Sequence, residues 1–142
     1  MADVNILIVE DERIIARDIE KRLKRMGYAV VGIMTTGENA VKTLSENIPD
    51  LVLMDIRLKG KIDGIEAANQ IRKQYDIPII FLTAHSDKDT LDRAKVAQPY
   101  GYLLKPFNVK DIATTIEISL YKHKMDIRCK QDLKQCVQKP KT

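Results

Sequence analysis

The sequence predicts an α/β fold in which helices cover both faces of a doubly wound, five-stranded parallel sheet. Five short and almost wholly apolar runs recur along the chain, and such runs are typical of strands buried on both faces. Between them lie segments whose apolar residues recur at helical spacing. This alternation of strand and helix favours parallel strands joined by crossover helices.

The five apolar runs give the expected strands, and the segments between them give five expected helices. The strands are expected at Val4–Val9, Tyr28–Ile33, Leu51–Met54, Ile77–Leu82 and Tyr100–Leu104. Helices are expected over 12–26, 37–47, 65–75 and 91–97, and from Asn108 onward. Gly27 is expected to end the first helix in a left-handed conformation, and Asn108 to cap the last one.

Each expected helix has apolar residues that should face the sheet. They are Ile15, Ile19, Leu23 and Met26 in the first, Ala40, Val41 and Leu44 in the second, Ile65, Ala68, Ile71 and Tyr75 in the third, Leu91, Ala94 and Ala97 in the fourth, and Val109, Ile112, Ile116 and Leu120 in the fifth.

Composition limits the class of protein. The 142 residues correspond to one domain, and no apolar run approaches the roughly 20 residues that a membrane helix needs. The first residues lack the order of a signal peptide, so we expect a cytoplasmic protein that does not bind membranes. The net charge is +5 over residues 121–142 and −1 over the rest. We therefore interpret the basic tail as a solvated helix face rather than a DNA-binding module.

Polar side chains directly follow four of the five expected strands. Glu10, Asp11 and Glu12 follow the first, Asp55 the third, Thr83 the fourth and Lys105 the fifth. Ligands of open parallel sheets bind beyond the C-terminal ends of the strands, so these groups should converge there.

The chemistry of these groups predicts metal-assisted phosphoryl transfer. Clustered carboxylates repel each other and favour a bound cation, and oxygen ligands without a thiol or imidazole cluster suit Mg²⁺. An aspartate can attack phosphorus and become an aspartyl phosphate, while a lysine neutralises the phosphoryl oxygens. Each residue alone has an ordinary explanation, such as a helix start or a turn, and the prediction rests on their joint placement.

Four stretches resemble the receiver domain of bacterial and archaeal two-component response regulators. They are ILIVEDE at 6–12, DLVLMDIRLKGKIDGIEAA at 50–68, IIFLTAH at 79–85 and GYLLKPF at 101–107. The resemblance covers roughly residues 3–122 and implies a flavodoxin-like, CheY-like sheet of strand order 2-1-3-4-5. It divides the chain into a receiver domain at 1–122 and a C-terminal helical extension at 123–142.

The resemblance also assigns roles to individual residues. It makes Asp55 the phosphoacceptor, and gives Mg²⁺ or Mn²⁺ the ligands Asp11, Asp55 and the backbone carbonyl of Arg57, with Glu10 bound through water. Thr83 becomes the switch hydroxyl, Lys105 the phosphate-binding lysine, Tyr102 the rotating aromatic residue and Pro106 a cis-proline. Arg57 and His85 become the residues that tune the phosphate lifetime.

The activity that the resemblance implies is signalling rather than turnover of a substrate. A histidine kinase would supply the phosphoryl group to Asp55, and the chain would catalyse only its own phosphorylation and dephosphorylation. The face formed by helix four, strand five and helix five would then change and be read by a downstream effector, or by an output or sensor domain missing from this sequence. One departure is the loop 56–64, which lacks the proline of many receivers and is one residue longer.

Three other interpretations compete with this one. A pseudo-receiver would bind partners without phosphorylation, but it would need none of the clustered polar residues. A phosphatase of the haloacid dehalogenase type would want a D-x-D pair after the first strand, where Glu10-Asp11-Glu12 stands. A flavin binder would want a Ser/Thr/Gly-rich loop there, and the phosphate-binding pattern G-x-x-x-x-G-K-[ST] is absent from the sequence.

The last helix is expected to continue to about residue 137, because an apolar stripe runs along it. The stripe comprises Ile118, Tyr121, Met125, Cys129, Leu133 and Cys136. A second copy could cover it in a homodimer through helices four and five, the helix could continue into a module of a longer chain, or its end could fray. The two cysteines are interpreted as reduced thiols, since no second ligand pair accompanies them.

Overall fold

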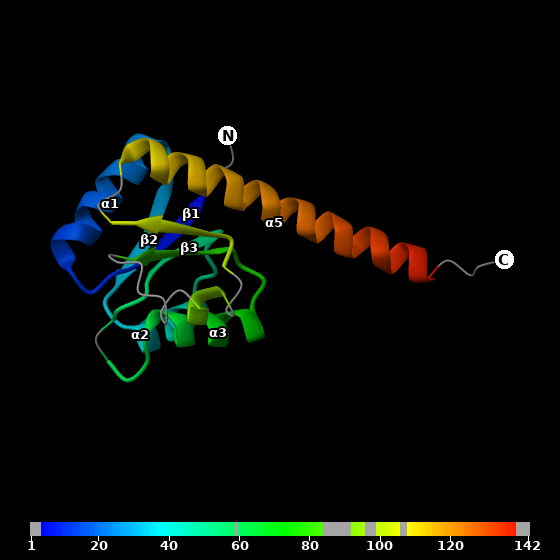
Figure 1. Cartoon of the computed structure of the whole chain (residues 1–142), viewed down its shortest axis with the longest axis horizontal. Helices are drawn as coiled ribbons and strands as arrows, with labels where there is room; N and C mark the ends of the chain where they lie inside the picture. Colours follow the sequence, from blue (N-terminus) through cyan, green and yellow to red (C-terminus); the bar gives the residue numbers. More distant parts are fainter. Residues whose placement is uncertain (1–3, 59, 84–91, 96–98, 106–107, 139–142) are drawn as a thin grey trace.

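In the computed structural model, residues 4–58, 60–83, 92–95, 99–105 and 108–138 are described, with side chains to residue 129. Five strands form one parallel sheet (Figure 1). They are β1 (Asn5–Val9), β2 (Ala29–Met34), β3 (Leu51–Asp55), β4 (Ile79–Thr83) and β5 (Gly101–Leu104), and their order is β2-β1-β3-β4-β5. The predicted fold class and strand order are confirmed.

Four helices of the described chain connect or follow the strands: α1 (Arg13–Arg25), α2 (Gly37–Leu44), α3 (Gly64–Gln74) and α5 (Val109–Gln138). Of the helix expected over 91–97, only residues 92–95 are described; they are helical, and Ala94 is buried as predicted. Leu91 and Ala97 lie outside the described residues.

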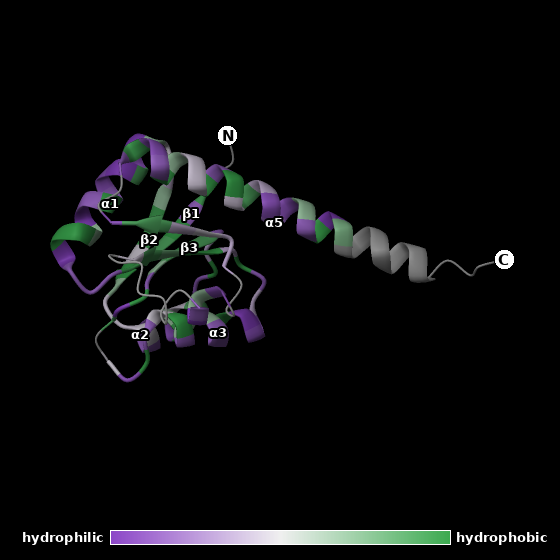
Figure 2. Cartoon of the chain, in the orientation of Figure 1, coloured by the Kyte–Doolittle hydropathy of each residue, from purple (hydrophilic) through white to green (hydrophobic). Residues whose placement is uncertain are grey.

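The sheet separates two apolar layers because successive side chains of a strand point to opposite faces. On one face, Leu7, Val9, Met54 and Phe81 pack against α2 and α3. On the other face, the alternate strand residues pack against α1 and α5; they are Ile6, Ile8, Leu51, Leu53, Ile80, Leu82 and Leu103. Figure 2 shows much of the sheet as hydrophobic and many residues of α1 as hydrophilic. This layering positions the sheet edge that carries the polar residues.

Both predicted helix caps are confirmed, whereas the predicted burial of one residue and the predicted start of one strand are wrong. Gly27 has a φ of 93°, and Asn108 Oδ1 accepts a hydrogen bond from Asp111 N–H at 2.8 Å. Val109 was predicted to face the sheet but is 46% exposed, because it is the first residue of α5 and precedes the turn that reaches the core. Strand β4 begins at Ile79 rather than Ile77, because Pro78 has no N–H to donate to the sheet.

Helix α5 extends well beyond the sheet (Figure 1). Its 30 residues confirm the predicted continuation to about residue 137 and correspond to about 45 Å of helix. In addition to its apolar packing on the sheet, two described polar contacts join the later part of this helix to the body: the Tyr100 hydroxyl donates to Asp126 Oδ2, and His123 Nε2 lies 3.2 Å from Asp76 Oδ1. No helix in the described part of the chain combines the length and the hydrophobicity that a membrane span requires.

Candidate functional site

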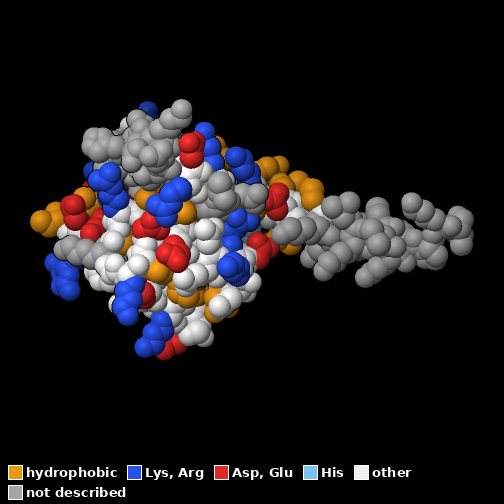
Figure 3. Space-filling model, turned by 60° about the horizontal axis from the view of Figure 1, so that its bottom comes forward, with side chains coloured by type: hydrophobic (Ala, Val, Ile, Leu, Met, Phe, Trp, Pro, Cys, Tyr) orange, Lys and Arg blue, Asp and Glu red, His pale blue; other side chains and the backbone are white. Residues whose placement is uncertain are grey.

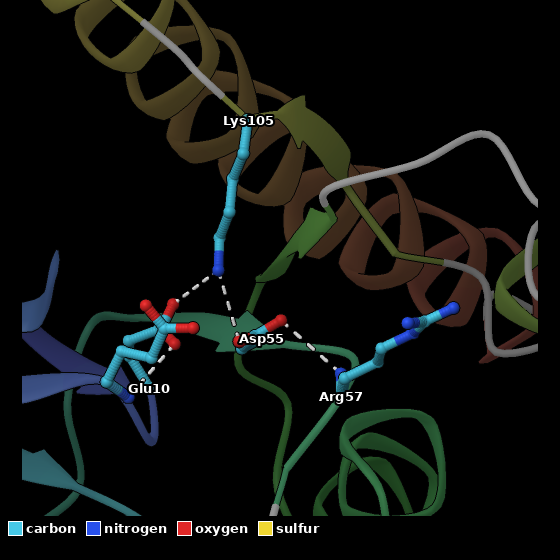
Figure 4. A network of polar contacts seen from close by, with 5 residues as sticks. Glu10, Asp55, Arg57 and Lys105 are labelled. Atoms are coloured by element: carbon cyan, nitrogen blue, oxygen red, sulfur yellow. Dashed lines mark hydrogen bonds and ion pairs between the residues drawn. The ribbon is translucent and has the colours of Figure 1, made fainter.

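Three elements bring the predicted polar residues together at the C-terminal edge of the sheet. Glu10 and Asp11 follow β1, Asp55 is the last residue of β3, and Lys105 follows β5. Lys105 Nζ lies 2.7 Å from Glu10 Oε2 and 3.2 Å from Asp55 Oδ2 (Figure 4). The order of the strands explains this meeting, because β1, β3 and β4 are neighbours and β5 flanks β4.

Asp55 is almost fully buried and its carboxylate is oriented from two sides. Lys105 contacts Oδ2, while the backbone N–H of Arg57 donates to Oδ1 at 3.3 Å. The Arg57 side chain points away from the carboxylates (Figure 4), so only its backbone takes part in the described contacts. A carboxylate held at both oxygens keeps one orientation toward whatever enters the edge.

Lys105 is fixed through its backbone as well as its side chain. Its N–H donates to the Thr83 carbonyl at 2.7 Å, which continues the β4–β5 pairing by one residue. Burial lowers the pKa of Lys105, but its hydrogen bond with Glu10 and the negative charges of Asp55 and Glu10 outweigh that effect and raise the pKa overall. The ammonium group therefore remains charged at neutral pH.

Glu10 is fully buried, and the Lys105 ammonium group that contacts it also contacts Asp55. Burial, followed by the interaction with the Asp55 carboxyl group, raises the pKa of Glu10 to about 8, although Lys105 acts in the opposite direction. Oxygens of Glu10, Asp11 and Asp55 lie within 4.8 Å of one another. Among the described residues, the three carboxyl groups have only one neighbouring ammonium group to balance their negative charge. Their clustered oxygens therefore suit a divalent cation such as Mg²⁺.

The remaining predicted residues differ in how the structure places them. Thr83 is buried at the end of β4, next to Lys105. Tyr102 lies on β5, where it is 38% exposed and its ring centroid is 6.3 Å from that of Phe81. His85 and Pro106 lie outside the described residues.

The sequence pattern missed two residues that hold the loop after Asp55. Glu38 on α2 accepts hydrogen bonds from the backbone of Lys61 and Ile62, and Arg93 forms an ion pair with Asp63. Neither Glu38 nor Arg93 directly follows a strand, and no motif in the sequence includes them. Charged residues on a helix are usually solvated, so the sequence offered no signal for either contact.

Comparison with known proteins identifies the family. Residues 6–117 match the family described as the response regulator receiver domain. The chain belongs to this family. It is 39% identical over 115 residues to the transcriptional regulatory protein PdtaR of Mycobacterium tuberculosis, a match that covers 81% of this chain and 56% of PdtaR. It is 34% identical over 117 residues to the phyllosphere-induced regulator PhyR of Methylorubrum extorquens, covering 82% of this chain and 43% of PhyR.

Solved structures support the same assignment. The signal receiver domain of a modulated diguanylate cyclase from Desulfovibrio desulfuricans is 38% identical, with a TM-score of 0.83 and coverage of 87% of this chain and 99% of that one. A fusion that carries a yeast Spc42 trimeric coiled coil is 34% identical, with a TM-score of 0.85 and coverage of 97% and 92%. The receiver domain spans about half the length of the curated relatives that it matches.

The crowding of carboxylates predicts that Asp55→Asn stabilises the metal-free domain. The substitution removes a charge that raises the pKa of Glu10 and leaves the ion pair between Lys105 and Glu10 intact. We expect a gain of about 1 kcal/mol in the free energy of unfolding, measured by urea denaturation with a chelator present.

The gain should depend on pH with a defined sign. Below a pH of about 8 a proton on Glu10 already relieves the repulsion, so the gain should be larger at pH 9 than at pH 6. If the Asp55→Asn protein is less stable than wild type at pH 9, the electrostatic description of the site is wrong.

Proposed function

We propose that this receiver domain accepts a phosphoryl group on Asp55 from the phosphohistidine of a histidine kinase in the cytoplasm. The observation that carries the proposal is the position of Lys105, whose ammonium group joins Glu10 and Asp55 at the end of the sheet. A buried aspartate beside a charged lysine is placed to take up phosphorus and to neutralise its oxygens.

In the transfer step, a carboxylate oxygen of Asp55 attacks phosphorus while the bond from phosphorus to the imidazole nitrogen breaks. The electron pair of that bond leaves with the imidazole, and the product is an aspartyl phosphate. Lys105 Nζ lies 3.2 Å from Asp55 Oδ2 and is therefore close enough to contact the incoming phosphoryl oxygens. The Thr83 hydroxyl, at the end of the adjacent strand, would donate a hydrogen bond to another of these oxygens.

A divalent cation fits the same edge of the sheet, and the three clustered carboxylates support this part of the proposal. Asp11, Asp55 and the backbone carbonyl of Arg57 would hold Mg²⁺ or Mn²⁺, and Glu10 would bind through water. When bound, the cation would supply positive charge that the carboxylates and the phosphoryl oxygens need. Burial of Glu10 and Asp55 keeps their oxygens from being fully hydrated, so they are available to such an ion.

The proposed switch connects the acceptor to β5. Thr83 would move toward the phosphoryl group, and Tyr102, which is partly exposed, would turn into the space that Thr83 leaves. Because Lys105 N–H is bonded to the Thr83 carbonyl, the ends of β4 and β5 are coupled through the backbone. The surface of β5, α5 and the helical residues 92–95 would then shift its population between two states, and a partner would read it. Arg57 and His85 would set the lifetime of the phosphate.

The output of the signal is proposed to lie outside this chain. Its excess of positive charge lies after residue 120, and Figure 3 shows Lys and Arg interspersed with Asp and Glu on the described surface of the body. An effector protein or a further domain of a longer chain would therefore respond to the phosphorylated face.

The acceptor assignment predicts the outcome of a mass measurement. After incubation with acetyl phosphate and Mg²⁺, the intact chain should gain one phosphoryl group, and a chelator should prevent the gain. Asp55→Asn should abolish the adduct because it removes the nucleophile, whereas Asp50→Asn, at the start of the same strand region, should not. If acetyl phosphate and the cognate kinase both fail to yield an adduct, the pseudo-receiver interpretation replaces this one.

We also propose that two copies associate through α5. Ile118, Tyr121 and Met125 are exposed and spaced three and four residues apart, as in the seam of a coiled coil. Figure 3 shows hydrophobic side chains where α5 leaves the body. In a parallel pair, Glu117 of one copy would lie beside Lys122 of the other, which adds complementary charge.

The dimer proposal predicts a change of mass in solution. Wild type should sediment with the mass of two chains, and Met125→Glu should sediment as a single chain because it places charge in the apolar seam. Lys124→Glu is the matched control on the adjacent position and should remain dimeric. An apolar helix pair should assemble at a protein concentration of about 0.1 mM. If wild type sediments as one chain both at about 0.1 mM and after 100-fold dilution, the chain does not self-associate.

A further inference from the structure

The segment after the acceptor, named here the acceptor loop (residues 56–58 and 60–63), is closed at its two ends. The Gly64 N–H donates to the Ile56 carbonyl at 2.8 Å, so the chain returns to within a few residues of Asp55. A side chain at Gly64 would collide with the Asp55 carbonyl, which means that only glycine permits this return. The loop between these ends carries the Arg57 carbonyl that the metal proposal uses.

The tip of the acceptor loop is bound by a carboxylate from another helix. Lys61 N–H and Ile62 N–H both donate to Glu38 Oε1, at 3.1 and 3.0 Å. They follow Gly60, whose φ of 111° lies in the left-handed region. Successive N–H groups in such a turn form a concavity that binds anions, and here the Glu38 carboxylate occupies it. A side chain at Gly60 would lie 2.7 Å from Glu38 Oε2, so the loop is shaped to receive this group.

The capped start of α2 places Glu38 beside the loop. It lies in the first turn of α2, whose N-cap Thr36 accepts a hydrogen bond from Asn39 N–H at 3.2 Å. At Gly37, an added Cβ would lie 3.0 Å from Ile62 Cγ1, so α2 and the loop are in close apolar contact beside the hydrogen bonds. The carboxylate therefore transmits the position of α2 to the loop backbone.

The other side of the acceptor loop is held by a second carboxylate. Asp63 Oδ1 accepts the Glu66 N–H at 2.9 Å and caps α3, while Asp63 Oδ2 forms a 2.7 Å ion pair with Arg93. The hydrogen bond between Gly64 and Ile56 thus joins the two ends of the loop, Glu38 binds its tip, and Asp63 fixes its last residue. Arg57, whose N–H binds Asp55 Oδ1, lies between the fixed points. Its carbonyl can keep one direction only while these points hold.

We infer that Glu38 is a positioning residue for the cation site: by binding Lys61 and Ile62 N–H, it aims the acceptor loop so that the Arg57 carbonyl can serve as a ligand. The inference rests on the proposed function, in which Asp11, Asp55 and that carbonyl hold a divalent cation. Ordering a longer loop costs more conformational entropy, and the two hydrogen bonds to Glu38 offset part of that cost.

The test compares Glu38→Ala, Glu38→Gln and the matched control Glu46→Ala. Glu46 follows the same helix and makes no described side-chain contact. The readouts are the Mn²⁺ dissociation constant from calorimetry and, in the metal-free protein, hydrogen exchange at the amides of Lys61 and Ile62. Glu38→Ala should weaken Mn²⁺ binding by about tenfold, the lower end of the effects of groups that orient metal ligands, and should speed exchange at both amides.

The two other variants separate positioning from folding. Glu38→Gln keeps an oxygen acceptor and should restore most of the affinity, and Glu46→Ala should match wild type in both readouts. If Glu38→Ala does not fold, Gly60→Ala, which pushes on the same carboxylate, takes its place. Faster exchange with an unchanged dissociation constant would overturn the inference and leave the metal site standing. A wild-type protein that binds no Mn²⁺ at millimolar concentration would overturn the proposed metal site itself, and the inference with it.

Discussion

Three carboxylates and one ammonium group share one end of a sheet whose central strands β1, β3 and β4 are almost entirely buried, and the remainder of the site is arranged around that imbalance of charge. Glu10 has no access to solvent, Asp55 has little, and both contact Lys105. Burial, and after it the neighbouring Asp55 carboxyl group, raises the pKa of Glu10 to about 8, although Lys105 acts in the opposite direction. The fold maintains this arrangement because the apolar layers on both faces of the sheet fix the strand ends. Perturbed pKa values of this kind cluster at functional sites.

In the proposed function, the same imbalance would connect binding to conformational change. A cation and a phosphoryl group would bring opposite charges to the edge, and each would change what Lys105 and Thr83 contact. Both residues belong to adjoining ends of β4 and β5, and their backbones are hydrogen-bonded. Charge added at Asp55 can therefore bias the position of β5 and of the helix that follows it. Helix α5 extends from there as a continuous element to Gln138, which would give the proposed switch a physical route to its output.

Sequence reasoning succeeded where a local pattern had one structural meaning. The buried runs determined the strands, and the residues that follow Val9, Leu82 and Leu104 met at one edge because parallel strands share an end. It failed where position depended on packing: Val109 has the right spacing to face the core but lies a turn too early in α5. Glu38 could not be found either, because its two hydrogen bonds depend on how a loop that is 23 residues away in sequence folds back onto α2. Tertiary contacts of this kind leave no periodic signal.

Whether the charge imbalance recruits a cation is decided by Mg²⁺ binding to the wild-type chain, with Asp11→Asn and Glu12→Gln as a matched pair. Asp11 belongs to the carboxylate cluster, whereas the adjacent Glu12 is exposed and contributes only its backbone N–H, which donates to Glu10. If uncompensated charge at the sheet edge recruits the cation, calorimetry should show one Mg²⁺ site in wild type, a similar site in Glu12→Gln, and a loss of at least tenfold in affinity in Asp11→Asn. Equal affinity in all three proteins would mean that the cation binds elsewhere and that the carboxylate cluster does not recruit it.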